Sequence, residues 1–352
     1  MHITICLFAL LLAAASARAA PFEWNAYGGD GNGRRYAPLA GITPANVDRL
    51  ALAWTFRTGE LGDGFGRAHD ALTFEATPLF VDGTLYIPTA TGKVFALDPA
   101  LGTERWRFDA AVDRSRDYSE MASRGVSYWR DADATADGPC SRRIIFATID
   151  ARLFAIDART GKRCADFGTN GEVALSKGVR LVERQLGNYQ VTSPPAIAGD
   201  VAVIGSSIGD NRGADIEIGV VRAFDVKSGR ELWHWDPIPR TAKIPADAAN
   251  PDFGDIEGQQ AHWTGAANAW APFAVDASRG FVFIPTGSAS PDFFGGERPG
   301  DDRWADSLVA LRVATGELVW AKQLVHHDLW DYDTASQPML VDLDRDGAKI
   351  AA

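Results

Sequence analysis

The most chemically dense stretch of the chain is HHDLWDYD, residues 326–333, which combines two histidines, three aspartates and two aromatic rings. Such a cluster has three possible roles. His326 or His327 with a carboxylate could hold a transition metal. One carboxylate kept among rings that exclude water could act as a general base. The cluster could also be a polar turn without chemistry, so the elements around it must decide.

The composition excludes two classes of partner. The chain has 352 residues, 46% hydrophobic and 23% charged, which is typical of a globular protein with a large core. Its net charge is -11. Nucleic acid and anionic membrane both favour clustered Lys and Arg, so nonspecific binding to either is not expected. Small neutral substrates remain open.

The N-terminus has the pattern of a secretion signal. An apolar run from Ile3 to Ala15 precedes an Ala-Arg-Ala sequence that ends at Ala19, the small-x-small pattern that signal peptidase cleaves. We therefore expect residues 1–19 to be a signal peptide and the mature protein to be secreted or periplasmic, with a buried N-terminal helix as the alternative. The run is shorter than the ~20 apolar residues of a membrane span, and no later segment qualifies.

Signal cleavage would remove Cys6 and leave Cys140 and Cys164 in an oxidising compartment, where disulfides persist. These two cysteines flank a predicted hairpin, RRIIFATI and RLFAID, that turns at Asp150 and Ala151. Antiparallel pairing carries the start of the first strand towards the residues after the second. A Cys140–Cys164 disulfide is therefore predicted, with two buried unpaired thiols as the alternative.

One phrase recurs four times, as VFALDPALGTERWRF, LFAIDARTGKRCADF, VRAFDVKSGRELWHW and LVALRVATGELVWAK. Each repeat is predicted to form a strand, a turn and a second strand. A glycine follows the Ala of the first strand by six residues, and a tryptophan follows that glycine by four in three repeats. Because such a unit cannot bury its sheet faces alone, repeats of this kind stack into a propeller or a solenoid. The repeat glycines are Gly102, Gly161, Gly229 and Gly316.

These repeats indicate an all-β fold, a partial β-propeller of about four blades. The repeat glycines lie further apart than the ~40 to 50 residues of a typical blade, so insertions between strands are expected to build a functional face. Three more segments are predicted hairpins: TPLFVDGTLYIPT, PPAIAGDVAVIGS and FAVDASRGFVFIPTG. One short helix is expected after Thr43-Pro44. The chain stops within a strand-like segment, and a propeller closes to remove its sheet edges, so the sequence is expected to be a truncated piece of a longer polypeptide.

Several motifs, in order, resemble the quinoprotein alcohol and glucose dehydrogenases, which use pyrroloquinoline quinone. They are WNAYGGDGNGRRYAPLAGITPANVDRLALAWTFRTGE, the tryptophan repeats, RGVSYW, TSPPAI, NAWAP and HHDLWDYD. The likeness is to the glucose, quinate and polyol branch. It implies an eight-bladed propeller, with the quinone and a divalent cation near its axis, that oxidises a sugar, polyol or related alcohol. Residues 20–352 would then be the N-terminal half of this propeller and are expected to be inactive alone. Since no haem-binding Cys-x-x-Cys-His occurs in the chain, a separate acceptor such as a membrane quinone or cytochrome c is expected, unless a C-terminal part beyond Ala352 carries a haem.

The quinone is flat, tricarboxylated and electrophilic, so it needs a ring to stack on, cationic and hydroxyl partners, and a Lewis acid. By the resemblance, Trp270 is the tryptophan that lies against the quinone, and Arg124 pairs with a cofactor carboxylate. Glu75 and Thr192 correspond to contacts at the polar rim of the cofactor, and Ser207 is expected to join them. From residue type alone, Trp270 could be a core residue, Arg124 a surface ion pair and Thr192 part of a turn.

Calcium is the cation that the family implies, with magnesium or a lanthanide as alternatives, and its ligands should be oxygens. Asp210 in GSSIGDN stands where glucose-type relatives carry Asp-Asn, so it is the first candidate ligand and Asn211 the second. An Asx turn is the alternative for this pair. A family asparagine ligand falls at Ser288, 18 residues after the stacking tryptophan. A hydroxyl is a weaker ligand, so the coordination there is expected to differ.

Asp331 takes the position of the family's catalytic aspartate, beside the cation. We expect it to ligate the cation and to accept the proton of the substrate hydroxyl while hydride passes to the quinone. Asp333 stands where lanthanide-using relatives also carry an aspartate, but glucose-type relatives share it. His326 and His327 are then structural or hydrogen-bonding residues rather than ligands.

Some positions depart from the family pattern, and two rival functions follow. DYSEMASRG lacks the adjacent cysteines of alcohol-oxidising relatives, the second repeat lacks a docking tryptophan, and the fourth has Arg312 where the others have Asp.

The first rival is a non-catalytic propeller scaffold of the outer-membrane assembly type, which needs neither long insertions nor a concentrated acidic site. The second is a zinc hydrolase built on His326 and His327, which is disfavoured because adjacent residues of a strand point to opposite faces.

Overall fold

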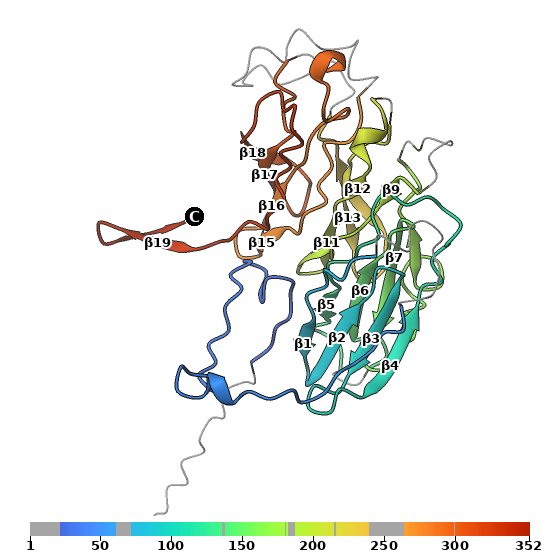
Figure 1. Ribbon diagram of the computed structural model, residues 1–352, viewed down its shortest axis with the longest axis vertical. Coiled ribbons are helices and arrows are strands. Elements are labelled where there is room, and N and C mark those ends of the chain that lie inside the picture. The colour runs from blue at the N-terminus through green and yellow to red at the C-terminus, as the bar shows by residue number, and fades with distance from the viewer. Residues whose placement is uncertain are drawn as a thin grey trace, which may run out of the picture.

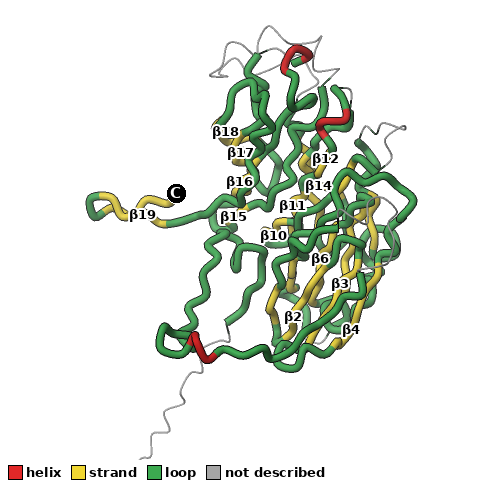
Figure 2. The backbone as a smooth tube through the Cα atoms, viewed as in Figure 1, coloured by secondary structure: helices red, strands yellow, loops and turns green. Residues whose placement is uncertain are grey.

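The computed structural model is an all-β structure in which four sheets have four antiparallel strands each (Figure 1). Within the described part of the chain, helix is confined to 3-10 turns of three residues (Figure 2). The described residues are 22–60, 72–135, 138–179, 181, 187–214, 216–238, 264–298 and 300–352.

Across each four-stranded sheet, the strands lie side by side in chain order. The first sheet contains β1 (Leu79–Val81), β2 (Thr84–Pro88), β3 (Lys93–Leu97) and β4 (Glu104–Asp109). The second contains β5 (Ser127–Arg130), β6 (Arg142–Ala147), β7 (Arg152–Asp157) and β8 (Glu172–Ala174). The third contains β10 (Ala196–Ala198), β11 (Val201–Ile204), β13 (Val221–Asp225) and β14 (Glu231–Trp235). The fourth contains β15 (Ala274–Asp276), β16 (Phe281–Pro285), β17 (Ser307–Arg312) and β18 (Leu318–Gln323).

Two smaller sheets and three 3-10 turns complete the described elements. The strand pairs are β9 (Tyr189–Gln190) with β12 (Ser207–Ile208), and β19 (Asp342–Arg345) with β20 (Ala348–Ala351). The turns are η1 (Val47–Arg49), η4 (Asp210–Arg212) and η6 (Gly295–Glu297). The β19–β20 hairpin stands apart from the other sheets (Figure 1).

The four sheets pack face to face, and the first strand of each sheet lies next to the first strand of the neighbouring sheet. Strand β7 illustrates the packing, because successive side chains point to opposite faces. Phe154 and Ile156 belong to the core shared with the first sheet, whereas Leu153 and Ala155 belong to the core shared with the third. Strands β1, β5, β10 and β15 lie next to one another in that order. This radial stacking is the predicted β-propeller; the total of eight blades stays a prediction.

Docking tryptophans join neighbouring sheets. Trp233, on the outer strand of the third sheet, lies against Gly316 of the fourth, and its indole N–H donates to the Val313 carbonyl at 2.7 Å. Trp106 and Trp54 make the same two contacts with the repeat glycine and a carbonyl of the sheet that follows them. Glycine is required here because a side chain would occupy the space of the indole ring. The repeated Gly and Trp therefore serve the interface between sheets.

The second repeat does not form the predicted strand, turn and strand. After β7 it makes only isolated bridges, and β8 supplies the fourth strand instead. Cys164 is bonded to Cys140, with 5.8 Å between their Cα atoms, and the chain turns immediately afterwards. The bond closes the ends of the β6–β7 hairpin, whose predicted pairing is confirmed. Without a tryptophan to place on the next sheet, the segment does not need to stay extended.

Other contacts replace the missing tryptophan between the second and third sheets. Gly229 lies against the backbone of Gly168 rather than an indole ring. Arg143 donates to the Val226 carbonyl at 3.1 Å, the bond that an indole N–H supplies elsewhere. This guanidinium is buried, and it also reaches Asp166 at 2.5 Å. A buried arginine thus substitutes for the docking tryptophan.

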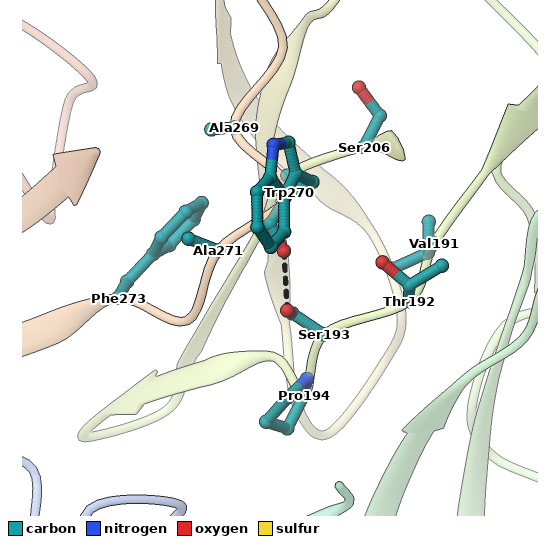
Figure 3. Close-up of a pocket in the computed structure, with 10 residues that line it drawn as sticks. Val191, Thr192, Ser193, Pro194, Ser206, Ala269, Trp270, Ala271 and Phe273 are labelled. Carbon is teal, nitrogen blue, oxygen red and sulfur yellow. Dashed lines mark hydrogen bonds between the residues drawn. The ribbon is translucent and has the colours of Figure 1, made fainter. Parts of the chain in front are cut away.

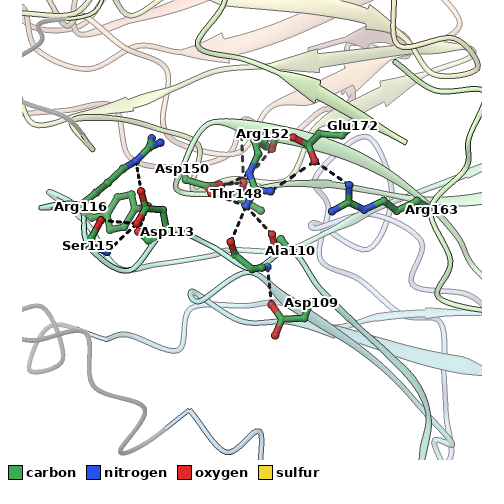
Figure 4. Close-up of polar contacts among 12 residues, drawn as sticks. Asp109, Ala110, Asp113, Ser115, Arg116, Thr148, Asp150, Arg152, Arg163 and Glu172 are labelled. Atoms are coloured by element: carbon green, nitrogen blue, oxygen red, sulfur yellow. Dashed lines mark hydrogen bonds and ion pairs between the residues drawn. The ribbon is translucent and has the colours of Figure 1, made fainter. Parts of the chain in front are cut away.

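A polar network joins the second sheet to the first. Arg152 pairs with the Asp150 carboxylate at 2.6 Å and donates to the Ala110 carbonyl at 2.7 Å (Figure 4). Glu172, on β8, binds Arg163 at 3.0 Å. These contacts hold β8 and the β6–β7 turn in place although the second repeat is irregular.

The remaining fold predictions have mixed outcomes. The hairpins β1–β2, β10–β11 and β15–β16 are confirmed. The helix expected after Thr43-Pro44 is only the single turn η1. The signal peptide expected at residues 1–19 lies outside the described residues. No helix among the described residues has both the length and the apolar character needed to cross a bilayer.

Candidate active site

Four predicted cofactor contacts occupy equivalent positions in successive sheets. Glu75, Arg124, Thr192 and Trp270 each lie three or four residues before the first strand of their sheet. Because these strands are neighbours around a common axis, the four residues lie at the same end of it. The backbone joins two of them directly, since the Arg124 N–H donates to the Thr192 carbonyl at 2.7 Å.

Arg124 is the centre of this group. Its guanidinium donates to Thr192 Oγ1 at 2.6 Å and pairs with Glu75 at 2.9 Å and Glu120 at 2.6 Å. The guanidinium carbon also lies 4.6 Å from the centre of the Trp270 ring. Although Arg124 is buried, its charge is therefore compensated by two carboxylates and an aromatic face.

Trp270 connects Arg124 to the acidic residues. Its indole N–H donates to Asp333 Oδ2 at 2.6 Å. Its carbonyl accepts from the Ser193 hydroxyl, and Figure 3 shows the ring standing above Ser193 and beside Phe273. One hydrogen bond thus holds the indole ring and the other holds the backbone that carries it. A small cavity lies behind it, lined by Val191, Thr192, Ser193, Pro194, Gly205, Ser206, Ala269, Trp270, Ala271 and Phe273.

Three aspartates form a compact oxygen cluster beside the indole. One carboxylate oxygen from each of Asp210, Asp331 and Asp333 lies within 4.8 Å of the other two. Asp210 comes from the turn η4, and the other two come from the acidic loop, which we define as residues 328–333. Asp331 has a φ of 62°, a left-handed conformation that aspartate adopts more readily than most residues. Oxygen clusters of this type suit hard cations.

The cluster holds more negative charge than its surroundings stabilise. Burial raises the pKa of Asp210 to about 8, and repulsion from Asp333 adds to the rise. Burial and Asp333 likewise raise the pKa of Asp331 to about 6. Burial also raises the pKa of Asp333, although hydrogen bonds from Ser288 and Trp270 oppose the rise. A cation bound here would favour the ionised form of all three carboxylates.

A cavity of about 290 Å³ brings most of the predicted site residues together. Its lining also includes Glu120, which sequence reasoning missed. Asp333, which belongs to the oxygen cluster, lines the same cavity. Glu120 accepts from Ser207 Oγ at 2.9 Å, so it links Ser207 to Arg124. Its sequence position, four residues before Arg124, did not reveal the contact with Ser207, because that residue lies on strand β12, far away in the chain. The cavity is lined by Ser119, Glu120, Arg124, Ser207, Ile208, Gly209, Asp210, Asn211, Trp270, Asp331 and Asp333.

Ser288 is next to the oxygen cluster, but its hydroxyl contacts Asp328 and Asp306 rather than the three clustered aspartates. Its Oγ is 2.8 Å from Asp328 Oδ2 and 3.1 Å from Asp306 Oδ1. Only its backbone N–H reaches the cluster, at 2.5 Å from Asp333 Oδ1. Burial and the charge of Asp328 raise the pKa of Asp306 to about 8. The structure therefore places the Ser288 hydroxyl between two buried carboxyl groups, not among the three clustered aspartates.

The histidines of the opening motif contact a different segment. His326 Nδ1 lies 3.4 Å from Asp301, and His327 Nδ1 lies 2.7 Å from the Gly300 carbonyl. Both residues are in bends, so the strand geometry assumed for them was wrong. Neither belongs to the groups of His, Cys, Asp and Glu that could hold a metal among the described residues.

The fold and the site together define a β-propeller protein in which three carboxylates that could hold a metal ion lie next to an aromatic and cationic surface. This donor set matches a flat, carboxylated cofactor together with a metal ion. The residue types thus fit pyrroloquinoline quinone and its cation.

Comparison with known proteins assigns the family. Residues 24–352 match the model for the glucose/ethanol/alcohol dehydrogenase β-propeller domain of pyrroloquinoline quinone enzymes. The chain belongs to this pyrroloquinoline quinone-dependent dehydrogenase family.

Individual relatives agree with this assignment. The quinoprotein glucose dehydrogenase of Escherichia coli is 38% identical over 93% of this chain and 40% of its own length. The glycerol dehydrogenase large subunit of Gluconobacter oxydans is 35% identical over 96% of this chain and 44% of its own. The structure of quinohemoprotein alcohol dehydrogenase from Pseudomonas putida has a TM-score of 0.75 at 28% identity, covering 94% of this chain and 44% of that one. The chain thus spans less than half the length of these relatives.

Proposed function

We propose that this chain forms part of a periplasmic quinoprotein dehydrogenase that oxidises a hydroxyl of a sugar, polyol or related alcohol. The observation that carries the proposal is the cluster of Asp210, Asp331 and Asp333 beside Trp270 and Arg124. Relatives named for glucose and glycerol support the substrate class. The acidic site also favours an enzyme over a propeller scaffold, which needs no such cluster.

The chain supplies recognisable groups for the cofactor. Trp270 offers a ring face, while Arg124, Thr192 and Ser207 offer donors for carboxylates. Glu75 and Glu120 already compensate the Arg124 charge, so they would compete with a cofactor carboxylate for it. When bound, the quinone supplies the acceptor for the hydride. Electrons would then pass to a separate membrane quinone or cytochrome c.

The cation would be held by carboxylate oxygens. Asp210 and Asp333 are the principal candidates, and Asn211 lines the same cavity. Calcium suits these ligands, and magnesium or a lanthanide also binds through oxygen. Bound there, the cation would act as a Lewis acid.

Asp331 is the proposed base. It is the most exposed of the three clustered aspartates, so an incoming hydroxyl can reach it. Its carboxylate would accept the hydroxyl proton at an Oδ atom. Asp210 and Asp333 remain to hold the cation while Asp331 carries the proton.

The test is Asp331→Asn in the full-length protein, with turnover and bound quinone measured across a calcium titration. Asparagine adopts the same left-handed backbone and can still offer an oxygen to the cation, but it cannot accept the proton. Turnover should fall ~100-fold to 10,000-fold while quinone binding persists. Asp346→Asn is the matched control, since Asp346 also has a positive φ, 54°, and lies in the exposed β19–β20 turn.

Other outcomes would assign Asp331 differently. Recovery of the rate in excess calcium would indicate that it serves mainly as a cation ligand. Near-normal turnover at every calcium concentration would refute the base assignment. Failure of the unmodified protein to bind the quinone would refute the proposed function itself.

A further inference from the structure

Ser288 is fully buried and contacts the acidic loop at two points. Its N–H donates to Asp333 Oδ1 at 2.5 Å, and its Oγ lies 2.8 Å from Asp328 Oδ2. The serine itself is fixed, because it follows strand β16 and its carbonyl accepts from the Ala267 N–H at 2.8 Å. A buried segment that follows strand β16 thus holds the first and last residues of the loop.

Asp328 transmits this contact to the middle of the loop. Its Oδ1 accepts from the Trp330 N–H at 3.1 Å, and its Oδ2 accepts from the Tyr332 N–H at 2.7 Å. These two residues flank Asp331, so the bonds fix the backbone that directs its carboxylate. The Asp328 carbonyl accepts from the buried Arg298.

Apolar packing cannot hold the loop in the same way. Trp330 is 75% exposed and Tyr332 is 63% exposed. The carboxylates of Asp331 and Asp333 also repel each other, which favours separation. The described contacts that oppose this separation come largely from Ser288, Asp328 and Trp270.

We propose that Ser288 and Asp328 are positioning residues that hold Asp331 and Asp333 in the geometry required for cation binding. The proposal rests on the cation site of the proposed function and assigns it two residues that do not themselves touch the metal. Groups that orient metal ligands through hydrogen bonds typically contribute ~10-fold to 100-fold to metal affinity. Ser288 therefore contributes to the site through Asp328 and Asp333, although its hydroxyl is not a ligand.

The experiment measures Tb³⁺ binding to the purified protein by luminescence excited through nearby tryptophans, such as Trp270, whose N–H contacts Asp333, and Trp330 of the acidic loop. Ser288→Ala removes the hydroxyl link but keeps the N–H link. Asp328→Asn replaces an acceptor oxygen with a donor. Each change should weaken Tb³⁺ binding at least ~10-fold well below the unfolding temperature. Activity is not needed for this readout.

Asp306→Asn is the matched control, because Asp306 accepts from the Ser288 hydroxyl but makes no hydrogen bond to the acidic loop among the described contacts, and the asparagine Oδ1 can still accept that bond. Its Tb³⁺ affinity should stay close to that of the unmodified protein. An equal loss in Asp306→Asn would show general disruption and overturn the proposal. Unchanged affinity in folded Ser288→Ala and Asp328→Asn would overturn it too.

Tb³⁺ and quinone binding to the unmodified protein distinguish failure of this proposal from failure of the proposed function. If the unmodified protein binds Tb³⁺ but no quinone, the proposed function is wrong, and the variants still decide the role of Ser288 and Asp328. If it binds neither, the cation site is wrong and both proposals fall. Should Asp328→Asn not fold, Ser288→Ala decides alone.

Discussion

The interface between the third and fourth sheets gives a sharp prediction for two glycines. Gly316 and Gly280 have the same φ of 72°, and each donates its N–H to a carbonyl four residues earlier, at 2.8 and 2.9 Å respectively. They differ in what a Cβ atom would meet. At Gly316 it would lie 2.5 Å from Cε3 of Trp233, whereas at Gly280 it would meet no described atom within 4 Å. Gly280→Ala is therefore the matched control for Gly316→Ala.

The expected magnitudes follow from this difference. A left-handed alanine costs ~1 to 2 kcal/mol, and both variants share this cost. Overpacking against a buried ring typically costs a further ~1 to 3 kcal/mol. The Trp233 N–H bond to the Val313 carbonyl, worth ~1 kcal/mol, is also at risk if the indole moves. Gly316→Ala should thus lower the free energy of unfolding by ~1 to 3 kcal/mol more than Gly280→Ala.

Urea denaturation followed by tryptophan fluorescence and circular dichroism measures both variants. The comparison requires equal m-values, because a changed m-value would indicate a changed unfolding transition. If Gly316→Ala is no more destabilising than Gly280→Ala, the tryptophan contact does not stabilise the junction between sheets.

Three further predictions concern the disulfide, a buried acid and the cofactor arginine. Replacing Cys140 and Cys164 by serine removes a bond between residues 24 apart in the chain and should lower the free energy of unfolding by about 3 kcal/mol. In the unmodified exported protein, alkylation under denaturing conditions should find no free thiol at either position. Because burial raises the pKa of Asp306 to about 8, the folded state retains a proton that the unfolded state releases near pH 4, so stability falls as the pH rises between these values. Asp306→Asn should therefore reduce the pH dependence of the urea midpoint between pH 5 and 8, leaving the part contributed by other buried acids such as Asp210, and an unchanged slope would contradict the assignment. Arg124→Lys should weaken quinone binding ~10-fold, measured by quenching of Trp270 fluorescence, because an ammonium cannot reproduce the forked contacts.

Sequence periodicity and local turn chemistry predicted much of the fold. Alternating apolar residues and Asp-Gly-type turns identified the hairpins, because strand pairing across a short turn is a local property. The second repeat was the exception. Its missing tryptophan was visible in the sequence, but the replacement by Arg143 was not, because that side chain reaches the third sheet from a different strand.

The sequence by itself determined which residues supply charge, aromatic surface and oxygen atoms, and its motifs singled out Trp270 and Arg124 as cofactor contacts. Only the tertiary structure decided how the acidic residues divide their roles. Asp333 joins the oxygen cluster, while the Ser288 hydroxyl faces Asp328 and Asp306. The physical reason is that the site forms where loops from different sheets meet. The distances across such a junction depend on how the sheets pack, and no local pattern of residues encodes them.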